Sequence, residues 1–331
     1  MSKKNPAQVE SLRIMLSAVW VLILLTQQVA SGQTTKEQEP AGPPPKYSFF
    51  TFFTQAPVAK VMYSLTVPTK YGQKMVSRER VLAQGRVSLP TNTSLSLDLC
   101  FDSLEHLDQL EQLYPCQVNS LSAANLDFED KHMHYLEGFK ELLSINLKDT
   151  LITDKSLPQI AMFSHLTSIN LVKTNVTGTG FACLTNLHKV KVIALEGISL
   201  KAGTVGKLKP LLANLISFNI GRTGLTKEDA AILKELKAVR ELRIDTNIRL
   251  DNECVNYLSH LTALQKLSIY DTSITDKCIP ILVKLPNLHT VTVRDKDFWT
   301  SKTHKAKYGQ VEFIDQERRS TMPADFFKPG N

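Results

Sequence analysis

The chain has 331 residues, of which 43% are hydrophobic and 21% are charged, a composition that excludes a disordered or collagen-like protein. A chain of this length folds as two domains or as one elongated domain. Its formal net charge of +7 is mildly basic. Five cysteines are too few for a fold held together by disulfides, and their odd number leaves at least one thiol unpaired.

Residues 1–32 have the pattern of an export signal. Lys3, Lys4 and Arg13 precede an uninterrupted apolar run of twelve residues, 14–25. This is the length of the apolar core of a secretory signal, whereas a bilayer span needs about 20 residues. Small residues at 30–32 offer a cleavage site. A cleaved signal is favoured, a single-pass signal anchor is the alternative, and both predict export to the periplasm, the cell envelope or the medium. A buried core helix is a third interpretation.

The next two segments are a linker and a β-rich cap. Residues 33–46 lack large apolar side chains and contain a run of three prolines, which predicts a stiff proline-rich linker. Residues 47–93 are rich in aromatic side chains and alternate like strands. Residues 46–90 carry seven basic side chains and one acidic side chain, Glu79. This basic segment is either a solvated hairpin cap or a contact site for anionic lipid or cell-envelope polymer.

A period of 24 or 25 residues runs through residues 94–294. For example, residues 142–154 (LLSINLKDTLITD) align with residues 264–276 (LQKLSIYDTSITD). One strand position recurs nine times, as Leu97, Leu121, Ile145, Ile169, Ile193, Phe218, Leu242, Leu267 and Val291. Apolar residues at helical spacing follow it, so each unit is predicted to be a strand and then a helix. Because a single unit cannot bury its apolar face alone, neighbouring units must stack.

This pattern resembles the leucine-rich repeat family, in particular bacterial repeats of the LxxLxLxxTxITDxxLxxL type. The resemblance implies an α/β solenoid, an arc with a parallel concave sheet of about nine strands and helices on the convex side. The β-rich amino cap would precede the arc, and residues 295–331 would form a carboxy-terminal cap or tail over its last strand. Threonines replace the ladder asparagine of many family members, and we expect their hydroxyls to bond neighbouring backbone groups. They are Thr150, Thr174, Thr223 and Thr272.

Side chains that flank the core positions of each strand point into the concave solvent, because side chains alternate along a strand. In the middle repeats they are small and neutral, and they include Asn146, Asn170 and Asn219. In the last three repeats they are larger and mostly charged. Since arginine and tyrosine dominate interface hot spots, this end is the predicted binding patch. Its members are Arg243, Asp245, Tyr270 and Arg294, with Glu241 and Lys266 beside them.

Both groups of side chains also have a purely structural interpretation. The charged residues of the last repeats would simply pair with one another across the strands. The asparagines and serines of the middle repeats would only keep an exposed sheet polar, although such a row is also suited to binding a glycan or a peptide backbone.

The sequence contains no GxSxG, GxxxxGK[ST], GxGxxG or HExxH motif, so no catalytic site and no cofactor are predicted. The pair His132 and His134 suggests a metal site only if a third ligand exists, and none is evident. In repeat register Met133 points inward and both histidines point outward. Because the concave columns mix charge signs, no nucleic-acid partner is expected.

The five cysteines are predicted to be free thiols. Cys254 and Cys278 occupy equivalent positions in adjacent repeats, where helices about 8–10 Å apart are too distant for a disulfide. Cys183 is predicted to lie in the core. Cys100 and Cys116 lie towards opposite ends of adjoining strands, so a bridge between them is not expected.

The chain is therefore predicted to be an exported, non-enzymatic module. The family resemblance implies that it binds a protein or peptide, here on the concave face. The alternative is a structural protein that is tethered to the envelope by its basic aromatic cap, residues 46–90, or by an uncleaved anchor.

Overall fold

The structure is a computed structural model that describes residues 47–53, 57–69, 72–90, 93–101, 104–294, 298–299 and 307–315. Two compact units are present, one of residues 1–43 with 67–74, the other of residues 44–66 with 75–331. The expected signal or anchor (1–32) and linker (33–46) lie outside the described residues.

The described chain begins with four antiparallel strands. β1 (Tyr47–Phe52) pairs with β4 (Gly85–Pro90) in a two-stranded sheet. β2 (Ala59–Thr69) pairs with β5 (Leu95–Leu99), the first strand of the repeats, and β3 (Gly72–Leu82) follows β2 in the strand order. The β-rich amino cap therefore covers the first edge of the repeat sheet, which would otherwise expose unpaired backbone groups.

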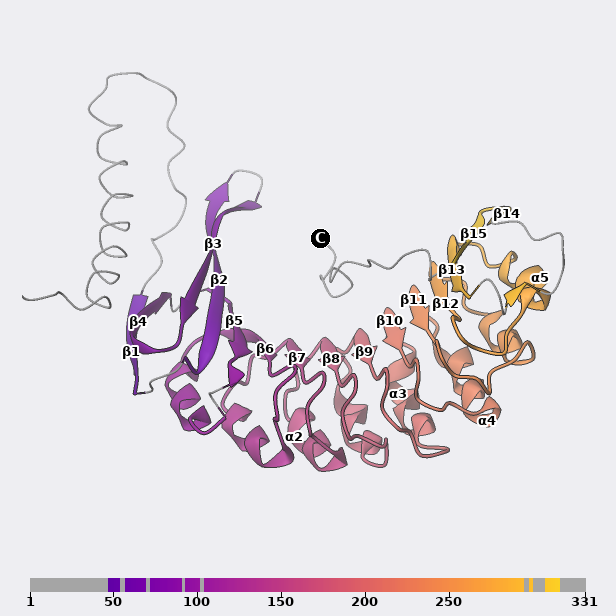
Figure 1. Ribbon diagram of the computed structural model, residues 1–331. Coiled ribbons are helices and arrows are strands. Elements are labelled where there is room, and N and C mark those ends of the chain that lie inside the picture. Colours follow the sequence, from indigo (N-terminus) through magenta and orange to yellow (C-terminus); the bar gives the residue numbers. More distant parts are fainter. Residues whose placement is uncertain are drawn as a thin grey trace, which may run out of the picture. The chain divides into compact units, whose positions relative to one another are not determined.

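Nine parallel strands, β5 to β13, lie side by side in sequence order (Figure 1). The predicted strand positions face one another directly, as Ile145 faces Ile169 and Phe218 faces Leu242. The 24- or 25-residue period is therefore the step from one strand to the next, and the predicted leucine-rich repeat solenoid is confirmed. After β5 the strands are β6 (Val118–Ser122), β7 (Ser144–Asn146), β8 (Ser168–Asn170), β9 (Val192–Ala194), β10 (Ser217–Asn219), β11 (Glu241–Arg243), β12 (Lys266–Ser268) and β13 (Thr290–Val293).

Short helical segments follow the strands and lie on the opposite side of the repeats (Figure 1). They are shorter than the predicted helices, and most are 3₁₀, which rises about 2.0 Å per residue against about 1.5 Å for an α-helix. A tight helix spans the width of a 24-residue unit with few residues. The 3₁₀ segments are η3 (Leu107–Leu113), η4 (Asp130–Leu136), η5 (Asp154–Ser156), η6 (Phe181–Asn186), η7 (Val205–Leu208), η8 (Ala231–Glu235), η9 (Cys254–Leu258) and η10 (Asp276–Cys278). Single α-turns are α2 (Leu157–Ile160), α3 (Lys209–Leu212), α4 (Lys227–Ala230) and α5 (Ile279–Leu282).

A continuous apolar core lies between the strands and the helical segments, and it is built from the repeat columns. Fully buried phenylalanines fill its wider places, namely Phe128, Phe139, Phe163, Phe181 and Phe218. Burial of these apolar columns against the neighbouring repeats drives the stacking of the repeats.

The ladder threonines act within their own repeats. Each hydroxyl donates to the carbonyl three residues earlier, as Thr150 does to Leu147 (2.7 Å) and Thr223 to Ile220 (2.9 Å). One repeat keeps the asparagine, which the sequence analysis overlooked: Asn247 lies five residues after Leu242, as Thr223 lies after Phe218. The buried Asn247 amide donates to the carbonyl oxygens of two repeats, those of Ile220 (2.9 Å) and Ile244 (3.0 Å).

The other end of the sheet is covered as well. β15 (Val311–Asp315) pairs in parallel with β13, and β14 (Lys307–Tyr308) pairs antiparallel with β15. Phe298 and Trp299 pack against Phe313, with ring centroids 5.5 and 5.6 Å from its ring. Residues 311–315 thus lie beside the last repeat strand, and they belong to the segment 295–331 that was expected to cover it.

Two predicted side-chain positions are wrong. Cys183 is exposed: its column is only partly covered, and it holds the exposed Lys207 in one repeat but the partly buried Tyr135, Ile232 and Ile281 in others. His132 is buried, whereas His134 is exposed as predicted. The Nδ1 atom of His132 accepts a hydrogen bond from the backbone N–H of Glu129 (2.9 Å), which closes a capping box at the start of η4. The thiols of Cys116, Cys183, Cys254 and Cys278 are not in disulfides, and Cys116, Cys254 and Cys278 are buried.

Candidate functional site

The sheet face is the solvent side of β5 to β13. The side chains on it are positioned by a turn that every middle repeat shares. Four residues after the core position the backbone has a positive φ, between 53° and 76°, at Asn125, Asp149, Lys173, Gly197, Arg222, Thr246 and Asp271. The N–H of this residue donates to the next repeat, as Lys173 does to the Glu196 carbonyl (2.8 Å) and Arg222 to the Asp245 carbonyl (2.6 Å). Backbone pairing therefore continues past the strand ends and fixes the side chains there.

The predicted patch of the last repeats, here the C-terminal patch (Glu241, Arg243, Asp245, Lys266, Tyr270 and Arg294), is brought together on this face. Nε of Arg243 donates to Oδ2 of Asp245 (3.0 Å), and Oδ1 of Asp245 accepts the backbone N–H of Tyr270 (3.1 Å). Burial raises the pKa of Asp245, and the Arg243 guanidinium opposes that rise. The carboxyl group thus ties β11 to the end of β12.

Arg294 and Tyr270 form the second element of the patch. The guanidinium lies over the tyrosine ring, 4.6 Å from its centroid, and Nη2 donates to the tyrosine hydroxyl (3.1 Å). Nη1 of Arg294 also makes an ion pair with Asp271 (2.7 Å), and Lys266 makes one with Glu241 (2.6 Å). The charged residues of the patch do pair across the strands, and the pairs hold the arginine and tyrosine in fixed orientations.

The predicted asparagines hold the ends of their own strands. The side-chain oxygens of Asn146, Asn170 and Asn219 accept the backbone N–H two residues later, at 3.1 to 3.2 Å. The Asn219 amide also donates to the Glu196 carboxylate (2.8 Å). These residues do not form one uninterrupted row, because Ala194 separates Asn170 from Asn219.

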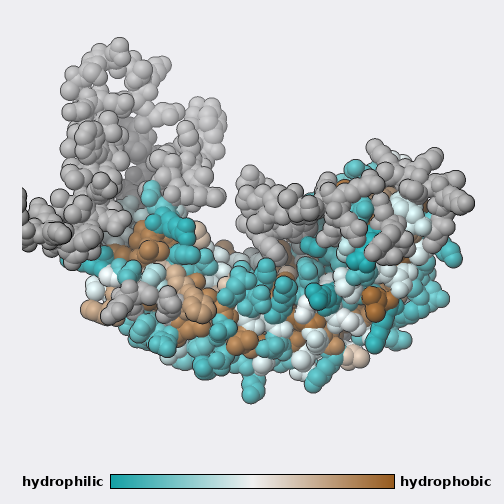
Figure 2. All heavy atoms as spheres, viewed as in Figure 1, coloured by the Kyte–Doolittle hydropathy of each residue, from teal (hydrophilic) through white to brown (hydrophobic). Residues whose placement is uncertain are grey.

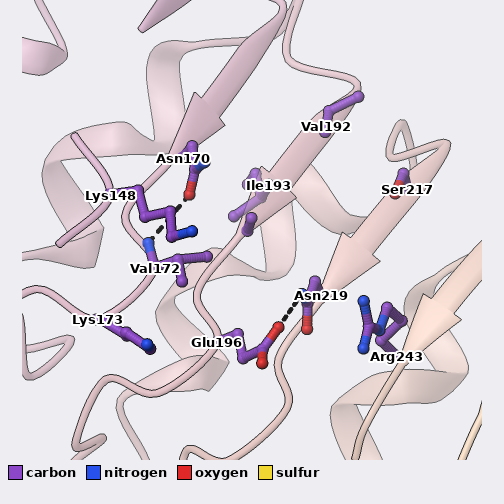
Figure 3. A pocket seen from close by; sticks show the side chains of 11 residues that line it. Lys148, Asn170, Val172, Lys173, Val192, Ile193, Glu196, Ser217, Asn219 and Arg243 are labelled. Atoms are coloured by element: carbon purple, nitrogen blue, oxygen red, sulfur yellow. Dashed lines mark hydrogen bonds between the residues drawn. The ribbon is translucent and has the colours of Figure 1, made fainter. Parts of the chain in front are cut away.

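A hollow of about 220 Å³ opens on the sheet face at this interruption (Figure 3). The repeat that forms it carries Val192, Ala194 and Glu196 on this face, and none of these residues was among the predicted binding residues. The signal was present in the columns, because β8 and β10 have serine and asparagine where β9 has valine and alanine. The hollow is lined by Lys148, Asn170, Val172, Lys173, Val192, Ile193, Ala194, Glu196, Ser217, Asn219 and Arg243.

A row of aromatic side chains is exposed on β1 and just after it. Tyr47, Phe49 and Phe53 share one face of the strand and are 46%, 65% and 81% exposed. The Arg86 guanidinium on β4 lies over the Phe49 ring, 4.6 Å from its centroid. Figure 2 shows hydrophobic side chains gathered over these amino-terminal strands.

The sequence left two features open, a metal site and a membrane span. Within the described ranges, no three or more histidine, cysteine, aspartate or glutamate side chains gather as ligands for a metal ion. The helices of the described part are too short or too polar to serve as a membrane span.

Solved structures include chains that are similar to this one. Internalin C2 from Listeria monocytogenes is similar over 56% of this chain and 83% of its own, with 23% sequence identity and a TM-score of 0.43. No protein-family profile and no curated protein matches the sequence. At so low an identity and TM-score, the assignment of the fold rests on the strand order and register described above.

Proposed function

We propose that this protein is an exported, non-enzymatic interaction module whose sheet face binds a protein or peptide at the C-terminal patch. The observation that carries the proposal is the Arg294–Tyr270 stack, in which two side chains of the types that dominate binding hot spots are already fixed in place. Because their orientation is set before a partner arrives, less side-chain entropy is lost on binding.

The neighbouring Arg243–Asp245 pair supports the same surface. The pair lies within two strands of the stack. The buried Asp245 joins the pair to the stack, because its carboxylate accepts the backbone N–H of Tyr270. Ion pairs that are complete within the protein leave no charge to be buried unpaired when a partner covers them. A partner therefore gains contact area on the ring and the guanidinium planes without a large electrostatic cost.

The test compares two variants of the chain as bait for proteins of the native envelope and the culture medium. Tyr270→Ala with Arg294→Ala removes the stack, whereas Lys234→Ala with Lys284→Ala removes two exposed positive charges on or beside the helical segments. We expect a partner that the wild type and the lysine variant hold and the stack variant loses, with at least a ten-fold weaker Kd after purification. Equal capture by both variants would place the binding site elsewhere.

The second candidate is an envelope-tethering protein, and the exposed aromatic row of β1 favours it. Aromatic rings beside an arginine suit the boundary between lipid head groups and acyl chains. Phe49→Ser with Phe53→Ser is expected to abolish co-sedimentation with vesicles that contain phosphatidylglycerol, whereas Leu143→Ser with Met162→Ser, exposed residues of the repeats, is not. Vesicle binding that is absent in the wild type would remove this candidate.

A further inference from the structure

The hollow on the sheet face exists because one repeat departs from its neighbours. Val192 stands in the column that holds serine on β8 and β10, and Ala194 stands in the column that holds asparagine there and lacks the asparagine amide. The apolar part of its lining, here called the floor, is made of Val172, Val192 and Ala194, and the polar Asn170, Ser217 and Asn219 line the hollow beside them.

The rim of the hollow is basic. Lys148 and Lys173 extend at one side and Arg243 lies at the other, with Glu196 and Asn219 between them (Figure 3). Arg243 is paired with Asp245, and Glu196 accepts a hydrogen bond from Asn219. In the part of the chain that the structure describes, the ammonium groups of Lys148 and Lys173 have no hydrogen-bond or ion-pair partner.

We propose that this hollow binds an acidic peptide segment, with a glutamate or aspartate carboxylate between Lys148 and Lys173 and an adjacent aliphatic side chain on the valine and alanine floor. The inference rests on the proposed function and names the chemistry of its partner. Two ammonium groups that point at the same opening attract an anion, and the low-dielectric floor strengthens that attraction relative to open solvent.

The size of the hollow selects a peptide over a larger ligand. About 220 Å³ equals the volume of roughly seven water molecules and is below the range of about 300–1,000 Å³ that is usual for pockets of drug-sized molecules. It accommodates one or two side chains. Three apolar side chains in so small a hollow disfavour a glycan, whose hydroxyls would lose their water against them.

The test uses two probe peptides and the full chain. The peptides are acetyl-GLELG-amide and acetyl-GLQLG-amide, which differ in one charge, and binding is measured by calorimetry. We expect the glutamate peptide to bind at least ten-fold more tightly, and the preference to shrink as salt is added. Equal binding of the two peptides, or binding of neither by the folded chain, would overturn the proposal.

Three variants locate the effect. Lys148→Ala with Lys173→Ala is expected to remove the preference for glutamate, whereas Lys140→Ala with Lys189→Ala, exposed lysines that do not line the hollow, keeps it. Val192→Ser, which restores the residue of the flanking strands, is expected to weaken both peptides about equally. A preference that survives loss of Lys148 and Lys173 would contradict the inference.

The proposed function has a separate readout. If the probe peptides show no preference but Tyr270→Ala with Arg294→Ala still abolishes partner capture, this inference fails and the interaction module stands. If the stack variant captures its partner normally while the glutamate preference depends on Lys148 and Lys173, the hollow is a binding site and the C-terminal patch is not.

Discussion

At the scale of single residues, aspartates join one repeat to the next. Asp154 accepts three hydrogen bonds from the following repeat, from the N–H and hydroxyl of Thr177 (2.9 and 2.7 Å) and from the N–H of Gly180 (2.8 Å). Asp130 bonds Thr153 and Ser156 in the same way. Thr153 caps η5 by accepting the Lys155 N–H (3.2 Å), whereas the next residue, Asp154, reaches the neighbouring repeat.

Loss of this bridge is expected to weaken the stack. Asp154→Ala leaves the Thr177 and Gly180 donors without their partner, so we expect the free energy of unfolding to fall by about 1–3 kcal/mol. Urea unfolding followed by circular dichroism measures it. Asp127→Ala, at an exposed aspartate, should change the free energy by less than about 0.5 kcal/mol. Similar losses in both variants would show that the bridge contributes no stability.

The same aspartates make stability depend on acid pH. Burial by itself raises the pKa of Asp130 and of Asp154, but the hydrogen bonds that each accepts outweigh it and hold both pKa values below 3.8. An aspartate in the unfolded chain has a pKa of about 3.9, so the unfolded state binds protons first. The stabilisation is therefore complete above that pH and is lost as the pH falls towards the folded pKa values. Thermal unfolding between pH 6 and pH 2 is expected to show a steeper acid loss for wild type than for Asp154→Asn, and identical slopes would contradict this.

At the scale of elements, the turn after each strand is strained in most repeats. Six of the seven positions with positive φ in this column carry a side chain, and Thr246 (φ 54°) is the β-branched one among them. This conformation crowds the Cβ atom and costs about 1–2 kcal/mol per residue. The strain persists because the N–H that it orients donates to the next repeat, here to the Tyr270 carbonyl (2.7 Å).

Asparagine tolerates the left-handed region better than threonine does, and Asn125 occupies this position in an earlier repeat. Thr246→Asn is therefore expected to raise the free energy of unfolding by about 0.5–1 kcal/mol, an effect that urea titration resolves. Thr262→Asn, at an exposed threonine without a positive φ, is the matched control and should be close to neutral. A neutral or destabilised Thr246→Asn would mean that the turn is not strained.

At the scale of the whole molecule, the repeats form one continuous sheet with both edges occupied. β2 pairs antiparallel with β5 at the first edge, and β15 pairs in parallel with β13 at the last. Each repeat contacts its neighbours only, so the face can vary from repeat to repeat while the register is kept. This is how the Arg–Tyr stack of the C-terminal patch and the hollow of the middle repeats coexist on one sheet.

Export is a property of the whole chain, and a fusion protein tests it directly. We expect residues 1–46 fused to alkaline phosphatase without its own signal to yield active enzyme outside the cytoplasm of a bacterial host. Leu22→Arg interrupts the apolar run and should abolish the activity, whereas Leu12→Arg, which precedes the run, should not. The size of the exported product distinguishes a cleaved signal from an anchor, and an inactive wild-type fusion would refute export.

The sequence by itself determined the register of the fold. All nine predicted strand positions pair with their predicted neighbours, because a side-chain period that repeats every 24 or 25 residues admits one stacking that buries every apolar column. The hydrogen bonds that the threonine hydroxyls donate lie within one repeat, so the repeat pattern was enough to predict them. The exposure of Cys183 was not readable from its column, which holds the exposed Lys207 but also the partly buried Ile232 and Ile281.

Only the tertiary structure decided what happens between repeats. The Asp154 bridge, the Arg294–Tyr270 stack and the hollow beside Ala194 each depend on side chains about 24 residues apart in sequence, and on the rotamers that they adopt when the repeats meet. A repeat pattern specifies which columns face each other, since that follows from backbone periodicity. It does not specify which polar atoms then bond across the columns or where small residues leave a space, because those depend on the volume and reach of particular neighbours.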